Sequence, residues 1–236
     1  MHLNHSTAEA IEIQIPESFR GFDKHAEIHT YHRYLPHWRQ KGATYFVTFR
    51  QADSIPKEVL IQMKNEADLW KERLSIEAPI QPELRREYDD FLTRRGQRLD
   101  DALDACHGSC QLHSTASRKI VADALLCFNE VRYEIYAAVV MPNHCHVLVR
   151  PFEDHPLENI LQGWKGYTAQ KINEEINRSG NFWQEESHDR IVRNTAHFQN
   201  AARYVLKNPA KANLSVSNYW AYCNRQKWGS PITSIS

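Results

Sequence analysis

The stretch VVMPNHCHVLVR, residues 139–150, decides the fold. A Pro-Asn dipeptide in its middle, flanked by apolar residues on both sides, is typical of a tight turn. We therefore predict two adjacent strands, 133–140 and 144–150, that pair as a hairpin at the centre of an antiparallel sheet. The second strand carries two histidines, His144 and His146, with a single residue between them.

Patterns on either side of this hairpin predict the rest of the fold. Apolar residues at helical spacing predict helices within 55–98 and over 157–177 and 195–209. RKIVADALLCFNEV predicts another helix, whereas GATYFVTFR and DRIVR predict strands. We expect the helix over 195–209 to begin with Thr195 as its N-cap and to stop at Pro209. This order indicates an α+β fold: an antiparallel sheet with helices on one face, plus a helical insertion at about 55–98.

The chain is expected to form one domain over residues 31–236. Residues 1–30 are polar and aperiodic, which predicts a flexible N-terminal arm. In YHRYLPHWRQKG, which follows the arm, the proline disfavours a regular element. The insertion lies in a stretch, Gln51 to Ala105, with 13 acidic residues against 9 basic ones, so we do not expect it to bind DNA. Dimerisation or contact with a host partner stays open for it.

Composition places the chain in the ordinary soluble range, with 42% hydrophobic and 25% charged residues among 236. Lysine plus arginine equals aspartate plus glutamate at 29 each, so the total charge gives no sign of a nucleic-acid partner. The distribution of charge along the chain is more informative. Between Ser187 and Trp228 there are seven basic residues and a single acidic one, Asp189. No signal-peptide pattern and no apolar run of ~20 residues is present, and five irregularly spaced cysteines do not indicate a disulfide framework. We expect a cytoplasmic protein that does not contact a membrane.

The histidine pair is a candidate metal site. Alternate side chains of a strand share a face, so His144 and His146 point the same way while Cys145 points into the opposite, apolar layer. Two imidazoles at this spacing can converge on one divalent metal. The alternative is a pair of histidines that face solvent on a half-exposed strand.

The helix over 195–209 offers a third ligand and a nucleophile. Tyr204 and Asn208 are four residues apart and therefore lie on one face of the helix. The amide oxygen of asparagine suits a hard cation such as Mg²⁺ or Mn²⁺, and the tyrosine carries a hydroxyl. The alternative is that Tyr204 is a core aromatic residue and Asn208 caps the helix before Pro209.

Four motifs together resemble a known family. MPNHCHVLVRP, GNFWQEESHDRIVR and YVLKNP, with HRYLPHWRQKGATYFVTFR near the N-terminus, are similar to the REP-associated tyrosine transposases, in the single-tyrosine branch of the HUH endonuclease superfamily. The resemblance covers about Tyr31 to Arg50 and Leu112 to Leu214. It implies an RRM-like or ferredoxin-like sheet with the histidines on a central strand and the tyrosine on a helix beside it. It also implies a bacterial, nucleoid-associated protein.

The resemblance implies a role for each candidate residue. His144, His146 and Asn208 would hold Mg²⁺ or Mn²⁺, and Tyr204 would attack phosphorus to give a 5′-phosphotyrosine intermediate on single-stranded DNA beside a REP-type hairpin. The product would allow both cleavage and strand transfer. Tyr167 is the rival nucleophile. The group that deprotonates the tyrosine is not indicated by the sequence.

DNA binding is expected on two basic stretches, the one between Ser187 and Trp228 and another from Thr30 to Arg50 that contains no acidic residue. The candidate residues are Arg33, His37, Trp38, Arg39, Arg190, Arg193 and Lys207, with Phe182 and Trp183 as further stacking candidates. The alternative for the last two is a place in the core, and the arginines could be merely solvated.

Two other functions remain compatible with the sequence: a catalytically idle protein that binds REP-type hairpins, and a metal-dependent phosphoesterase that uses water. Either a monomer or a homodimer is compatible with the sequence. CHGSCQLH, residues 106–113, is expected to be a loop, with a zinc site as the weaker alternative because no second cysteine pair lies nearby.

Overall fold

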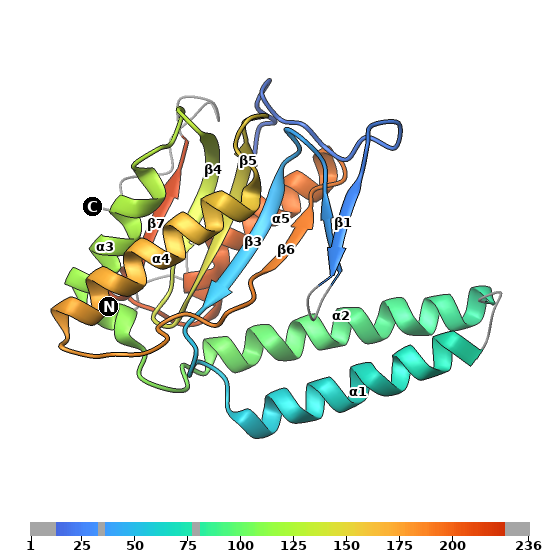
Figure 1. The fold of residues 1–236 in the computed structure, drawn as a ribbon, viewed down its shortest axis with the longest axis horizontal. Coiled ribbons are helices and arrows are strands. Elements are labelled where there is room, and N and C mark those ends of the chain that lie inside the picture. Colours follow the sequence, from blue (N-terminus) through green and yellow to red (C-terminus); the bar gives the residue numbers. More distant parts are fainter. Residues whose placement is uncertain (1–12, 33–35, 77–80, 225–236) are drawn as a thin grey trace, which may run out of the picture.

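A computed structural model describes residues 13–32, 36–76 and 81–224 (Figure 1). The strands are β1 (His29–His32), β2 (Pro36–Arg39), β3 (Tyr45–Arg50), β4 (Tyr133–Val140), β5 (His144–Pro151), β6 (His188–Ile191) and β7 (Trp220–Cys223). The helices are α1 (Lys57–Ile76), α2 (Pro82–Asp104), α3 (Thr115–Leu126), α4 (Leu157–Glu175) and α5 (Thr195–Lys211), with 3-10 turns at Gln111–His113 and Val216–Asn218.

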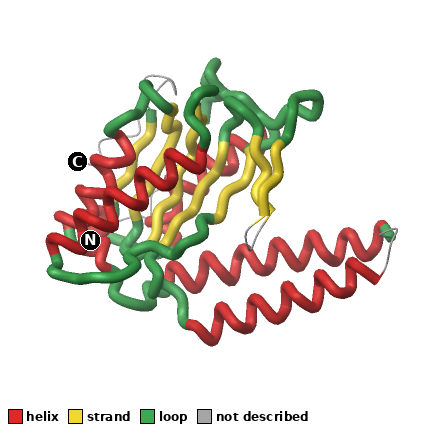
Figure 2. The backbone as a smooth tube through the Cα atoms, in the orientation of Figure 1, coloured by secondary structure: helices red, strands yellow, loops and turns green. Residues whose placement is uncertain are grey.

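Five strands form one antiparallel sheet in the order β6-β3-β5-β4-β7 (Figure 2). The elements β3, α3, β4, β5, α4 and β6 follow one another along the chain and place β3 and β5 at the centre, which is the split βαβ arrangement of ferredoxin-like folds. The strand β7 is added beside β4 at the opposite edge from β6. The predicted α+β fold with a helical insertion is confirmed, and so is the β4–β5 hairpin.

Helices cover both faces of this sheet. Cys145, Val147 and Val149 of β5 pack in the core under α3 and α4, whereas Leu148 packs with residues of α5 on the other side. The expectation of helices on one face holds for α3 and α4 but not for α5. The reason is that all eight residues of β4 are buried, so this strand is apolar on both sides and both need a cover.

Two segments show features that the sequence did not predict. The segment at the proline of YHRYLPHWRQKG forms the β1–β2 hairpin, in which Pro36 is the first residue of its strand, a position that proline tolerates. Cys106 and Cys110 are joined by a disulfide within the loop before α3, so the zinc alternative is not supported. Along the described ranges, no helix is long and apolar enough to cross a membrane.

The N-terminal segment packs on the domain from Ile13 onward. Ile13 is fully buried and its carbonyl accepts a hydrogen bond from Gln199 at 2.9 Å. The ring of Phe19 lies edge-on to that of Phe198, with centroids 4.9 Å apart. Ile13 and Phe19, which belong to the expected flexible arm, are therefore packed against α5, whereas residues 23–29 are exposed.

The insertion is a helical hairpin that lies apart from the sheet layers (Figure 1). Its two helices contact each other through the rings of Trp70 and Phe91, 5.4 Å apart, and through the ion pair of Arg73 with Glu87 at 2.8 Å. The hairpin extends to Asp104, beyond the expected end near residue 98. Its last turn returns to the sheet, where Leu103 is buried.

Candidate functional site

The two histidines of β5 form a buried pair on the sheet face that α5 covers. Both His144 and His146 are only 1% exposed. Their Nε2 atoms face each other at 3.1 Å. The alternative of two solvent-facing histidines is wrong, because α5 and the neighbouring strands enclose this face.

Hydrogen bonds orient the ring of His144. Its Nδ1 lies 2.7 Å from the side-chain oxygen of Asn143, whose amide nitrogen donates to the backbone carbonyl of Leu103 at 3.0 Å. Because that carbonyl can only accept, the oxygen of Asn143 must face His144, and Nδ1 of His144 carries the proton. The Nε2 atom of His144 is therefore left as a lone-pair donor.

A second partner orients His146. Its Nδ1 lies 2.8 Å from the hydroxyl of Thr48 on the neighbouring strand β3. The ring of Phe46 stacks on that of His146, with centroids 5.6 Å apart. A hydroxyl can donate or accept, so Thr48 permits the tautomer of His146 in which Nε2 is unprotonated.

Burial keeps both imidazoles neutral. It lowers the pKa of His144 to about 3, helped by the positive charge of Lys211. Burial also holds the pKa of His146 well below its usual range, with smaller effects from His144 and nearby cations. Neutral imidazole is the form that binds metals, so the pair is ready to act as a ligand set at neutral pH.

The helix α5 brings two further side chains to this face. Asn194, rather than Thr195, caps it by accepting a hydrogen bond from His197 at 2.9 Å, since the capping side chain stands one residue before the first helical one. The ring of Tyr204 lies edge-on to that of His146, with centroids 5.1 Å apart. Asn208 lies one turn further along the same face.

The side chain of Asn208 has buried polar atoms that a bound metal ion could provide with a partner. It is 2% exposed, and neither its amide oxygen nor its amide nitrogen has a hydrogen-bond partner among the described residues. It is not the C-cap, because α5 continues through Pro209 to Lys211. A buried amide without a partner costs ~1–3 kcal/mol, so a missing ligand is a physical explanation for it. Two imidazole nitrogens and one amide oxygen fit a divalent cation.

The third member of this candidate ligand set is the amide of Asn208, where many metal sites have a carboxylate, a thiolate or another imidazole. In the parts of the chain that the structure describes, no group of three or more His, Cys, Asp and Glu side chains is arranged to hold a metal. The candidate ligands His144, His146 and Asn208 do not form such a group, because asparagine is not one of these residue types.

The hydroxyl of Tyr204 is buried and has no hydrogen-bond partner of normal geometry in the described ranges. Burial raises its pKa well above the usual range, and the negative charge of Asp100 raises it further. Asp100 belongs to α2, and burial raises the pKa of its carboxyl in turn. The phenol therefore needs a base to take its proton, and the acidic group whose charge affects its pKa most, Asp100, comes from the insertion.

The last turns of α2 and α5 are joined by ion pairs. Lys211 lies 3.0 Å from the carboxylate of Asp104 and 3.4 Å from that of Asp101. The insertion thus forms one wall of the site, which sequence reasoning missed, as it missed Asn143 and Thr48. Asn143 carried only a turn signal, and nothing in an acidic helical pattern singled out Asp100.

Several of the expected DNA-binding side chains are available at the surface. Arg190, Arg193 and Lys207 are exposed, and the guanidinium of Arg190 lies over the ring of Phe46 at 5.2 Å. Trp38 is 54% exposed. Arg33 and the side chain of His37 lie outside the described residues.

Other expected DNA contacts are corrected by the structure. Arg39 is buried and pairs with the carboxylates of Asp189 and Glu158, so its guanidinium is already used within the protein. Phe182 and Trp183 are buried in the core under α4 and cannot stack on bases. A guanidinium held by two carboxylates has little left to offer a phosphate.

Tyr167 is excluded as the rival nucleophile by its position. It is an exposed residue of α4. This helix covers the face of the sheet that Cys145 joins, whereas the histidines point to the α5 face. The sheet therefore separates Tyr167 from His144 and His146.

Comparison with known proteins shows that one segment of this chain matches a protein family, and that the segment contains both histidines, Tyr204 and Asn208. The family described as "Transposase IS200 like" matches residues 116–208, which include His144, His146, Tyr204 and Asn208. The resemblance to transposases of this kind is confirmed for that segment, which leaves out the β1–β2 hairpin and the insertion. A solved structure described as "Structure of the REP associates tyrosine transposase bound to a REP hairpin" is similar at 17% identity, with a TM-score of 0.46, over 86% of this chain and 93% of that chain. Comparison with curated proteins gives no match.

Proposed function

We propose that this chain, whose residues 116–208 match the IS200-like transposases, is a metal-dependent single-stranded DNA endonuclease and strand transferase that acts through Tyr204. One observation carries the proposal: the ring of Tyr204 packs against His146 on the face where the Nε2 atoms of the two histidines meet. All the side chains required lie in a single chain, so the proposal holds for a monomer and does not depend on a second copy.

His144, His146 and Asn208 are the proposed metal ligands. Asn143 and Thr48 hold the two rings from behind, which leaves both Nε2 atoms directed at the same point. Mg²⁺ or Mn²⁺ bound there would polarise a non-bridging phosphate oxygen and offset the charge that develops at phosphorus.

Tyr204 is the proposed nucleophile. Its hydroxyl oxygen forms a bond to phosphorus while the bond from phosphorus to the 3′-oxygen of the preceding nucleotide breaks. The products are a strand joined through its 5′-phosphate to Tyr204 and a strand with a free 3′-hydroxyl, which takes up one proton. Because the new phosphodiester keeps the bond energy, attack by a 3′-hydroxyl reverses the step and gives strand transfer.

Asp100 is the proposed acceptor of the tyrosine proton. It is the acid whose charge acts most strongly on the Tyr204 hydroxyl, and burial makes it a stronger base than an exposed carboxylate. Arg190 has the opposite effect to Asp100 on the pKa of Tyr204, because its positive charge favours the phenolate.

The proposed substrate is single-stranded DNA next to a REP-type hairpin. Arg190, Arg193 and Lys207 are exposed around α5 and would neutralise backbone phosphates, while Trp38 offers an exposed ring for stacking. The cytoplasm, at the nucleoid, is the compartment where such a substrate occurs.

The test is a search for the covalent intermediate. The protein is incubated with Mn²⁺ or Mg²⁺ and a 3′-labelled oligonucleotide that carries a REP-type hairpin, because the strand that stays on Tyr204 keeps the 3′ end, and the products are separated on a denaturing gel. A protein–DNA adduct is expected for the unchanged protein and for Tyr167→Phe, and none for Tyr204→Phe.

The other outcomes identify the competing functions. Cleavage without an adduct in any of these proteins would mean that water is the nucleophile. Binding of the hairpin without cleavage under either metal would mean an idle binding protein. Either result overturns the role of Tyr204.

A further inference from the structure

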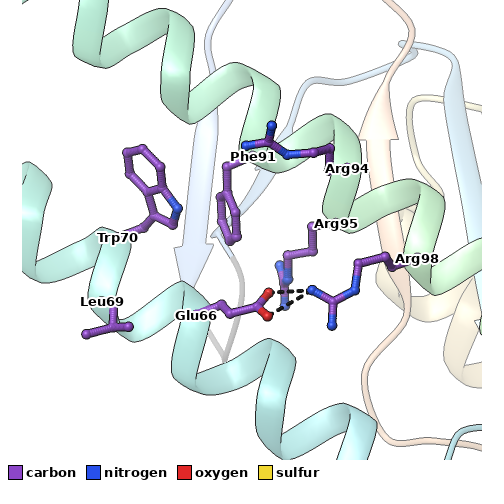
Figure 3. Close-up of a pocket in the computed structure, with 7 residues that line it drawn as sticks. All are labelled: Glu66, Leu69, Trp70, Phe91, Arg94, Arg95 and Arg98. Carbon is purple, nitrogen blue, oxygen red and sulfur yellow. Dashed lines mark hydrogen bonds and ion pairs between the residues drawn. The ribbon is translucent and has the colours of Figure 1, made fainter.

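The insertion hairpin carries a cavity that lies outside the site around Tyr204. Its volume is about 320 Å³, and it opens between α1 and α2 (Figure 3). Ligand pockets in proteins begin at about this size. All of its described lining residues belong to the insertion, so this is a separate site and not an extension of the first.

One side of the cavity is apolar and aromatic. Trp70 of α1 and Phe91 of α2 line it, with ring centroids 5.4 Å apart and planes inclined by 29°. Leu69 also lines the cavity and is 66% exposed. A ring surface beside an exposed aliphatic side chain at an opening accepts a flat, apolar group.

The other side is cationic. Arg94, Arg95 and Arg98 line it from consecutive turns of α2. Glu66 pairs with Arg98 through two contacts of 2.7 and 2.9 Å. Arg94 and Arg95 have no carboxylate partner among the described residues, and the buried Nε of Arg95 has no hydrogen-bond partner there. The pocket therefore offers positive charge that no carboxylate in the described ranges neutralises.

We propose that this pocket binds one nucleotide unit of single-stranded DNA, with the base against Leu69 and Trp70 and the phosphate at Arg94 and Arg95. The ligand must be flat and apolar at one end and anionic at the other, which is the chemistry of a nucleotide. Arginine suits the phosphate because its planar fork of donors matches phosphate oxygens. The acidic total of the insertion does not oppose this, since the pocket itself contains one acid against three arginines.

The same helix connects this pocket to the site described above. Arg95 and Leu103 are both on α2, and eight residues of helix span about 12 Å. At ~3.4 Å per nucleotide along one strand, this corresponds to about four nucleotides. A strand held at Tyr204 can therefore reach the pocket. This placement relative to the cleaved bond rests on the proposed function, whereas binding in the pocket does not.

The test measures binding of a fluorescent single-stranded dT12 by anisotropy in EDTA, in a Tyr204→Phe background so that no chemistry occurs. Arg94→Ala/Arg95→Ala is expected to weaken binding by roughly ten-fold or more and to lower the salt dependence of log Kd by about 0.7, the contribution of one phosphate contact on a single strand. The matched control is Arg85→Ala/Arg86→Ala, which removes the same charge from the same helix outside the pocket.

A second pair of variants tests the apolar side without disturbing the packed rings. Leu69→Glu places a negative charge at the pocket and is expected to weaken dT12 binding at least five-fold. Ile76→Glu, at another exposed position of α1, is its control and should leave the Kd unchanged. Thermal melts of all variants establish that the hairpin remains folded.

Three results would overturn the proposal. These are an equal effect in the two arginine pairs, unchanged affinity in both pocket variants, and binding of an acidic peptide or of dTMP as tight as that of dT12. None of them would alter the adduct experiment with Tyr204→Phe, so failure here leaves the proposed function standing.

Discussion

The amide nitrogen of Asn143 donates to the backbone carbonyl of Leu103 at 3.0 Å, and this bond ties the last turn of the insertion to the histidine pair. The side-chain oxygen of the same asparagine accepts from Nδ1 of His144. The insertion therefore helps to orient His144, the first proposed metal ligand, although it lies outside the sheet layers.

Replacing Asn143 should weaken metal binding. Asn143→Leu removes both hydrogen bonds, so His144 loses its fixed tautomer, and the affinity for Mn²⁺ should fall by about 10- to 100-fold. Isothermal titration calorimetry measures this. Asn143→Asp keeps the size of the buried side chain and the acceptor but not the donor, and a smaller loss is expected. Equal Mn²⁺ affinity in all three proteins would contradict this orienting role.

Asp100→Asn should slow formation of the adduct if its carboxylate accepts the proton of Tyr204. Loss of a positioned general base costs about 10²- to 10⁴-fold in rate. Removal of the charge alone would instead lower the pKa of Tyr204 and speed the reaction, because Asp100 raises that pKa. Single-turnover rates separate the two cases. Asp101→Asn, at an exposed neighbour that pairs only loosely with Lys211, is the control and should react normally.

Arg39 should prove to be a structural residue. Arg39→Met removes the guanidinium that pairs with the buried carboxylate of Asp189, and the free energy of unfolding should fall by about 3–5 kcal/mol. Urea denaturation measures this. Arg39→Met/Asp189→Asn removes the buried negative charge as well and should recover most of the loss. If Arg39→Met were stable but bound DNA poorly, Arg39 would return to the DNA-binding set.

Acid should destabilise the metal-free protein through His144. An unfolded histidine takes up a proton near pH 6.5, whereas burial holds the pKa of folded His144 at about 3. Between these values the unfolded state binds more protons, so the free energy of unfolding decreases as the pH falls, by at most about 1.4 kcal/mol per pH unit for this group. Urea melts in EDTA between pH 7 and pH 4 measure the slope.

The variant His144→Gln provides the control for that slope. It removes the titrating ring but can keep a hydrogen bond to Asn143, and its stability should vary less with pH over the same range. Parallel curves for the two proteins would show that His144 does not contribute to the acid sensitivity.

Local patterns in the sequence were sufficient for most elements. The two apolar runs of residues 133–140 and 144–150 predicted β4 and β5 almost to the residue, because the tight turn between them fixes where each strand ends. The spacing of His144 and His146, and of Tyr204 and Asn208, predicted which pairs share a face, because the periods of strand and helix fix this locally. The Nε2 atoms of the two histidines do meet, and the ring of Tyr204 lies against His146.

Only the tertiary structure decided what stands opposite each face. It brought α5 to the histidine side of the sheet and α4, with Tyr167, to the other, because which helix covers which face depends on chain crossings between distant segments. It turned Arg39 inward onto Asp189, a partner 150 residues away along the chain. It also placed Asp100 and Leu103 of the insertion at the site. Sequence patterns report the periodicity of one segment, whereas these contacts join segments whose separation in the chain carries no periodic signal.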